Sequence, residues 1–233
     1  MIEHGHATHT GLARAHNEDN YWADAERGLW LVADGMGGPG RGEVASALAL
    51  QTMLGSLHRD TPLPEAIQHA GAAIQAHPSQ HGTTTPMGST LAALKLNGAD
   101  AYEVAWIGDS RVYLWQDGHL ARVPHPARIP GSETDPAAAG EARQTSVRSR
   151  ATQALGITPE TDLHAESASG QCSPGMQFLL CSDGLTEELD DARIAAIVSR
   201  TDLAAQECVD HLMLAALERG GKDNITAVLV RIR

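Results

Sequence analysis

Four aspartates in this 233-residue chain adjoin apolar, strand-length stretches and lie near glycine residues. They are Asp34 after LWLVA, Asp109 after VAWIG, Asp183 after MQFLLCS, and Asp223 before ITAVLV. A strand carries such a carboxylate to the edge of a sheet, and a neighbouring glycine lets backbone carbonyls or a ligand come close. Carboxylates that meet at one edge repel each other unless cations lie between them. Mg²⁺ and Mn²⁺, which take oxygen ligands, are the cations that this arrangement favours.

Each of these aspartates has a simpler interpretation when it is taken alone. Asp-Gly is a common turn sequence, so a structural turn residue explains any one of them. Four of the same kind favour a metal centre, and no His/Cys set has the spacing of a zinc site. His4, His6 and His9 are either an opportunistic nickel-binding cluster or solvated surface residues.

A fifth chemical feature is the segment from Arg14 to Asp19, which places one guanidinium before two carboxylates. Arginine is suited to bidentate capture of a phosphate group. Glu18 and Asp19 could accept hydrogen bonds from metal-bound waters. The alternative is a surface loop held by ion pairs.

The spacing of apolar residues predicts the strands and helices that position these residues. The pattern predicts strands at 29–33, 90–96, 102–107, 112–115, 120–123, 176–181 and 225–232. It predicts helices at 44–57, 67–74, 194–198 and 205–216. Asp117-Gly118 is a hairpin turn signal. This order favours a layered α+β fold with antiparallel sheets.

Composition excludes several functional classes. Seventeen Lys+Arg against 29 Asp+Glu give a net charge of −12, which opposes charge-driven nucleic-acid binding. No segment resembles a secretory signal or a membrane span. Cys172, Cys181 and Cys208 lack a C-x-x-C spacing, which is typical of reduced thiols. We therefore expect a cytoplasmic protein with no nucleic-acid or membrane partner.

Residues 124–150 have a different composition from the rest of the chain. They hold four prolines, two glycines and only two large aliphatic residues. Arginines gather in and beside them: Arg122, Arg128, Arg143, Arg148 and Arg150. The segment is either a solvated linker or a mobile flap beside a site that receives an anion.

Six groups of motifs occur together in a fixed order along the chain. They are R-x-x-x-E-D at 14–19, V-A-D-G-M-G-G at 32–38 with G-E-x-A-S at 42–46, M-G-S-T at 87–90, I-G-D-S-R at 107–111, L-C-S-D-G-L at 180–185 and G-G-K-D-N-I-T at 220–226. In this combination the chain resembles the metal-dependent protein phosphatases of type 2C, in their compact bacterial form, from about residue 4 to residue 232.

The resemblance implies a four-layer α/β/β/α sandwich with two central antiparallel sheets. It implies a single catalytic domain over residues 1–233, with the flap at about 124–150. It also implies hydrolysis of phosphoserine and phosphothreonine in proteins, opposing a cognate Ser/Thr kinase, with two or three Mn²⁺ or Mg²⁺ ions as cofactors. We expect a monomer.

The family's metal ligands transfer to this sequence motif by motif. By this resemblance Asp34 would bridge two metals, and the carbonyl of Gly35 would bind the first. Asp183 and Asp223 would hold the second. Asp109 would help to form a third, weaker site together with Asp183.

The resemblance also implies the mechanism. A water bridging the two metals would attack phosphorus in line, without a covalent phosphoenzyme. Arg14 would bind the substrate phosphate, and Glu18 and Asp19 would order metal-bound waters. The cysteines lack the C-x₅-R loop of a cysteine-based phosphatase.

The chain departs from the family at three places. Met36 stands where many eukaryotic relatives carry a histidine proposed as general acid, and Pro39 replaces a histidine frequent in bacterial members. The flap sequence is the third departure, so substrate choice and the third metal transfer least directly.

Two other functions compete with a protein phosphatase. A catalytically inactive phosphoprotein-binding module on the same fold is disfavoured, because such proteins usually lose a metal aspartate and none is missing here. A dimetal hydrolase of small phosphoesters or nucleotides is the second, and the arginine-bearing flap fits a protein substrate better.

Overall fold

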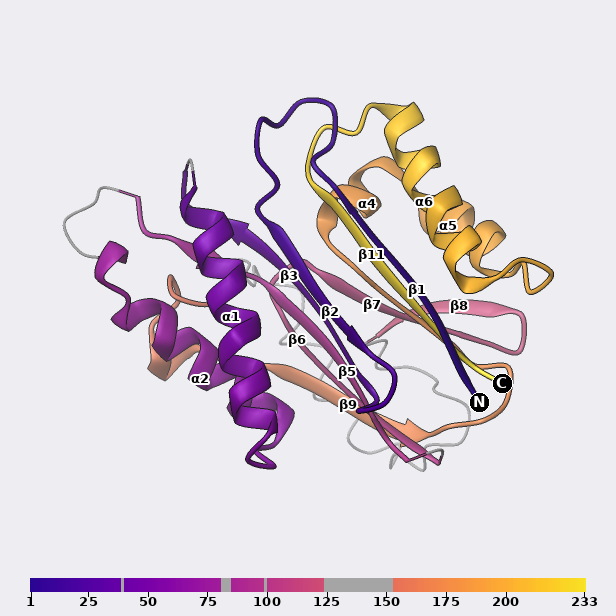
Figure 1. Ribbon diagram of the computed structural model, residues 1–233, viewed down its shortest axis with the longest axis horizontal. Coiled ribbons are helices and arrows are strands. Elements are labelled where there is room, and N and C mark those ends of the chain that lie inside the picture. The colour runs from indigo at the N-terminus through magenta and orange to yellow at the C-terminus, as the bar shows by residue number, and fades with distance from the viewer. Residues whose placement is uncertain (39, 81–84, 99, 124–152) are drawn as a thin grey trace, which may run out of the picture.

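Two antiparallel sheets packed face to face form the centre of the molecule (Figure 1). A computed structural model describes residues 1–38, 40–80, 85–98, 100–123 and 153–233. The first sheet has the order β1 (Ile2–His9), β11 (Ile225–Ile232), β10 (Gln177–Cys181), β7 (Arg111–Gln116) and β8 (His119–Val123). The second has the order β2 (Asp19–Asp24), β3 (Leu29–Met36), β5 (Leu91–Asn97), β6 (Ala101–Ile107) and β9 (Glu166–Gln171), and β4 (Gly88–Ser89) pairs with β3.

Helices cover the outer face of each sheet (Figure 1). Helices α1 (Arg41–Leu57) and α2 (Leu63–Ala76) pack on the second sheet, and α4 (Asp183–Glu188), α5 (Asp191–Val198) and α6 (Ala205–Arg219) lie against the first. Two short 3₁₀ helices span Pro78–Gln80 and Glu160–Asp162. None of the helices in the described ranges is long and apolar enough to cross a membrane.

Three apolar layers hold these four layers of secondary structure together. The middle layer lies between the sheets and includes the fully buried Trp30 and Phe178. The outer layers lie between each sheet and its helices, for example around Met53 on α1 and Leu212 on α6. Burial of this much apolar surface is the main force that favours the fold. The predicted α/β/β/α sandwich is confirmed.

The first and last strands pair along their whole length. In the register of β1 and β11, Ile2 lies opposite Ile232 and His9 lies opposite Ile225. The termini are therefore adjacent, and the backbone N–H of Arg233 donates to the carbonyl of Met1 at 2.8 Å (Figure 1). Every residue of β11 is buried, because β11 lies between β1 and β10 with helix α6 on one face and the second sheet on the other.

Most predicted elements are present within a few residues of their predicted bounds. The turn between β7 and β8 contains Asp117 and Gly118 with φ of 51° and 80°, as a two-residue hairpin turn of type I′ requires. Strands β1, β2, β4 and β9 and helix α4 were not predicted. The proposed flap at 124–150 lies outside the described residues, which include only Arg122 of its five arginines.

Candidate active site

A cleft of about 390 Å³ lies at one end of the sandwich, between the edges of the two sheets. All four strand-end aspartates line it, together with Arg14, Glu18 and Gly35. Seven of the eight residues predicted from sequence therefore face one cavity, and the eighth, Asp19, lies behind it. The full lining is Arg14, Ala15, His16, Glu18, Asp34, Gly35, Met36, Gly37, Gly38, Asp109, Asp183, Asp223 and Asn224.

Both sheets deliver carboxylates to the cleft. Asp34 lies near the end of β3 in the second sheet, and Asp109 follows β6 of the same sheet. Asp183 begins α4 directly after β10 of the first sheet, and Asp223 precedes β11. The face-to-face packing of the sheets thus brings together residues that are distant in sequence.

Close packing at the end of β3 requires glycine. A Cβ on Gly35 would collide with the carbonyl oxygen of Gly42 at the start of α1. A Cβ on Gly42 would lie 2.6 Å from the carboxyl carbon of Glu18. The Gly42 N–H donates to Glu18 Oε1 at 3.2 Å, and the Ser46 hydroxyl donates to the Glu18 carbonyl at 2.6 Å. The start of α1 therefore fixes Glu18 at the rim of the cleft.

Asp19 is held from behind the cleft. It is only 5% exposed and lies opposite Asp34 in the β2–β3 register. Its Oδ2 accepts hydrogen bonds from the hydroxyls of Ser182 at 2.7 Å and Thr226 at 2.6 Å. Its Oδ1 is buried and has no partner among the described residues. A water or cation in the cleft would satisfy that oxygen.

Asn224 clamps the loop that carries Arg14 and Glu18. Its side-chain amide donates to the carbonyls of Thr10 at 2.8 Å and His16 at 2.9 Å. Its Oδ1 accepts from the Glu18 N–H at 2.8 Å. No role was predicted for Asn224, Ser182 or Thr226, although each lies within one of the six motif groups. Their contacts join positions far apart in the chain, and no local pattern marks such pairs.

Burial and mutual repulsion raise the pKa values of the carboxylates in and beside the cleft. Burial and then the charges of Asp19 and Asp183 raise the pKa of Asp34 to about 10. Burial likewise raises the pKa of Asp19 and of Asp183 to about 6, with neighbouring carboxylates adding to the shift. Such shifts show that more negative charge is gathered here than the surrounding groups neutralise.

Arg14 is the only Arg or Lys among the residues that line the cleft in the described structure. Its Nη2 donates to Asp223 Oδ2 at 2.6 Å. No three His, Cys, Asp or Glu side chains in the described ranges converge as tightly as a metal-bound set.

The donor set nevertheless fits hard divalent cations. The four lining aspartates and the Gly35 carbonyl supply oxygen alone, which Mg²⁺ and Mn²⁺ prefer. The raised pKa values and the orphaned Asp19 oxygen are features that a bound cation would relieve. Met36 lines the same cleft, whereas Pro39 lies outside the described residues.

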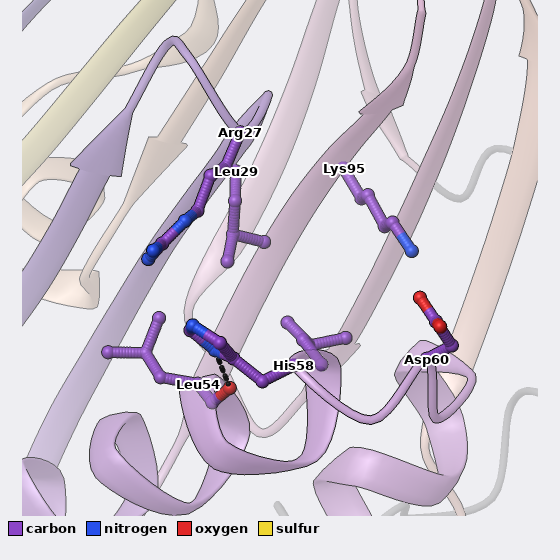
Figure 2. Close-up of a pocket in the computed structure, with 7 residues that line it drawn as sticks. Arg27, Leu29, Leu54, His58, Asp60 and Lys95 are labelled. Carbon is purple, nitrogen blue, oxygen red and sulfur yellow. Dashed lines mark hydrogen bonds between the residues drawn. The ribbon is translucent and has the colours of Figure 1, made fainter.

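A second pocket of about 270 Å³ lies at the other end of β3, beside the end of α1 (Figure 2). Leu29 and Leu54 supply an apolar lining, and Figure 2 shows Lys95 and Asp60 pointing toward each other across it. The His58 ring Nδ1 is 2.8 Å from the Leu54 carbonyl. This pocket contains no cluster of carboxylates, so we assign the chemistry to the aspartate cleft.

The comparisons with known proteins agree on one family. The family model described as Protein phosphatase 2C matches residues 11–219. The serine/threonine protein phosphatase PstP of Mycobacterium tuberculosis is 33% identical over 234 residues, which cover 95% of this chain and 43% of PstP. This chain thus spans less than half the length of that relative. The serine/threonine phosphatase stp of Listeria innocua is 28% identical over 96% of this chain and 93% of its own length.

A solved structure shares the fold at similar identity. The catalytic domain of PstP in complex with two manganese ions superposes with a TM-score of 0.77 and 30% identity, over 99% of this chain and 97% of that domain.

Proposed function

This chain belongs to the protein phosphatase 2C family of metal-dependent serine/threonine protein phosphatases, and from that membership we propose that its aspartate cleft removes the phosphoryl group from phosphoserine and phosphothreonine in proteins. The observation that carries the proposal is the convergence of Asp34, Asp109, Asp183 and Asp223 on one cleft beside Arg14. We propose that residues 1–233 act as one catalytic domain.

Four groups would hold two Mn²⁺ or Mg²⁺ ions. Asp34 would contact both ions, the Gly35 carbonyl the first, and Asp183 and Asp223 the second. Asp109, whose charge raises the pKa of Asp183, would share a weaker third ion with it, as the resemblance to the family implies. When bound, the ions would supply an activated water and positive charge for the phosphoryl oxygens.

The chain's own residues would position the substrate. Arg14 would leave Asp223 and bind the phosphoryl oxygens, because a cation would then neutralise Asp223 in its place. Glu18 and Asp19 would order water in the cleft, Glu18 from the rim and Asp19 through its unpaired Oδ1. Ser182 and Thr226 hold Asp19 for that role.

The partners that we propose are phosphorylated Ser/Thr proteins, including a cognate Ser/Thr kinase or its substrate. A small-phosphoester hydrolase is the competing enzyme, and an inactive binding module is the competing non-enzyme. The retention of all four cleft aspartates argues against the inactive module.

The test is phosphate release from a phosphothreonine peptide with Mn²⁺, with Mg²⁺ and with excess chelator. We expect release that depends on the metal and stops on chelation. Faster turnover of free nucleotides than of the peptide would favour the small-phosphoester enzyme. A folded sample that binds either metal but releases no phosphate would favour the binding module.

A further inference from the structure

An exposed leucine lies two residues before Arg14, which lines the cleft. Leu12 is 67% exposed, and among the large apolar side chains that the structure describes only Met1 is more exposed. Its Cα lies no more than two chain steps of ~3.8 Å from the Cα of Arg14, the proposed phosphate-binding residue. Leu12 and Leu217, which packs against the apolar layer beneath α6, both adjoin Gly221, and most of the surface of Leu12 is open to solvent.

The backbone around Leu12 is fixed. Its N–H donates to the Gly221 carbonyl at 2.6 Å. Gly11 adopts a φ of +80°, and a Cβ there would collide with the carbonyl oxygen of Asp223. Asn224 holds the carbonyls of Thr10 and His16 on either side. Because the loop is already ordered, a ligand that contacts Leu12 loses little additional conformational entropy.

The side chain of Leu12 lies beside the segment that carries Asp223. A Cβ built on Gly221 would be 3.3 Å from Leu12 Cγ, so the leucine lies over a glycine two residues before that aspartate. Arg14 and Asp223, which form an ion pair, line the cleft next to it. A peptide whose phosphoryl group reaches Arg14 therefore passes close to an apolar, preordered side chain.

We propose that Leu12 is a specificity-determining contact, which binds an apolar side chain of the substrate close to the phosphorylated residue. The inference rests on the proposed phosphatase function. Contact between two apolar side chains removes both from water, whereas an acidic or polar side chain at that position would lose hydration without a partner. Substrates with a flanking leucine, isoleucine or methionine are bound in preference to their polar counterparts.

The test uses phosphothreonine peptides in a serine-rich background, with a single leucine moved through the positions on each side of the phosphothreonine. At one of these positions we expect kcat/KM for the leucine peptide to be about five- to twentyfold higher than for the peptide that carries serine there. The Leu12→Ala variant should reduce this ratio to near one, and Leu12→Met should keep most of it.

Leu214→Ala is the matched control. Leu214 is 57% exposed on α6 and lies outside the cleft, so its truncation should leave the ratio unchanged. A ratio that persists in Leu12→Ala overturns the inference, as does the absence of any leucine preference in the wild type. An equal loss on both peptides in Leu12→Ala also overturns it, because the leucine would then only support the loop. No turnover of any peptide by the metal-loaded wild type would instead reject the proposed function.

Discussion

Asp183 is a carboxylate whose charge destabilises the fold that carries it. It is half-buried, and Asp109, Glu187 and Asp223 lie near enough to raise its pKa beyond the effect of burial. Groups of this kind are found where charge is needed for chemistry rather than for stability. The same residue should therefore act in opposite directions on stability and on activity.

Asp183→Asn tests this opposition. Removal of one of the crowded charges should raise the Tm of the metal-free protein by about 2–4 °C, which corresponds to about 1 kcal/mol. Loss of an ionised ligand should lower kcat with Mn²⁺ by at least about 100-fold. Thermal unfolding in chelator and turnover of a phosphothreonine peptide measure the two effects. Near-normal turnover would contradict the metal assignment of Asp183.

Arg14→Ala separates two roles of the arginine. The structure pairs Arg14 with Asp223, and the proposed mechanism gives it to the substrate phosphate. We expect KM for the phosphopeptide to rise by about 10–100-fold, the loss expected for a charge-assisted hydrogen bond. Mn²⁺ affinity, measured by calorimetry, should be unchanged or higher, because Asp223 loses a competing cation. A collapse of Mn²⁺ affinity would show that Arg14 is structural.

Site residues were predictable where a local pattern marks them. Asp34 lies near the end of one buried strand and Asp183 just after another, and each precedes a glycine, a pattern that is visible in the sequence alone. Asn224 and Thr226 were missed, because their importance lies in hydrogen bonds to residues more than 200 positions away. Asp19 was assigned to ordering water, but nothing in the sequence showed that it would be buried behind the cleft.

At the scale of elements, strand β1 depends on a residue without a side chain. Gly5 faces α6, and a Cβ there would lie 2.5 Å from both the N and the Cα of Gln206. These are backbone atoms of a helix, so they cannot move aside as a flexible side chain would.

Gly5→Ala should therefore lower the free energy of unfolding by about 3 kcal/mol and the Tm by about 6–12 °C. Gly55→Ala is the matched control within α1, because a Cβ there would meet only Arg59 Nη1 at 3.8 Å. The control should raise stability by about 0.5–1 kcal/mol through helix propensity and a less flexible unfolded chain. Equal changes in Tm for both substitutions would show that the clash with α6 does not cause the loss of stability in Gly5→Ala.

The α-helices other than α4 and the central strands were predictable from sequence, whereas β1, β2 and β9, three of the four edge strands, were not. Helix α1 and strand β3 carry regular apolar patterns. Strands β1 and β9 lie at the edges of their sheets and read IEHGHATH and ESASGQ, with few β-branched or aromatic residues. Their neighbours in the sheet, rather than their own propensity, determine that they are strands.

At the scale of the whole molecule, metal and pH should act together on stability. Asp19 and Asp183 have folded pKa values of about 6, above the ordinary value of 3.8. Their contribution to the stability of the metal-free fold is therefore fully present below pH ~4 and is lost as the pH rises through 6. A divalent cation must displace the protons of these two residues at low pH but finds Asp19 and Asp183 ionised at neutral pH.

Mn²⁺ is used at one fixed concentration, about 100 times its Kd at pH 7.5. It should raise the Tm by about 5–10 °C at pH 7.5 and by less than half of that at pH 5, where protons compete with the metal. Burial and the nearby His6 lower the pKa of His4, so acid also destabilises the protein through His4. That effect is the same with and without Mn²⁺ and cancels in the difference. A metal-dependent rise in Tm of equal size at both pH values would contradict the carboxylate site.

Because β1 pairs with β11, the first sheet is completed only late in synthesis. Thr8 and Thr226 share a hydrogen bond at 2.7 Å although they lie 218 positions apart. A ribosome delivers β11 after every other described element, at about 5–20 residues per second. Until then β1 and β10 have no central strand between them, and Asp223 is not in place. A nascent chain therefore carries three of the four cleft aspartates without a closed first sheet, and the cleft is complete only when synthesis has passed β11.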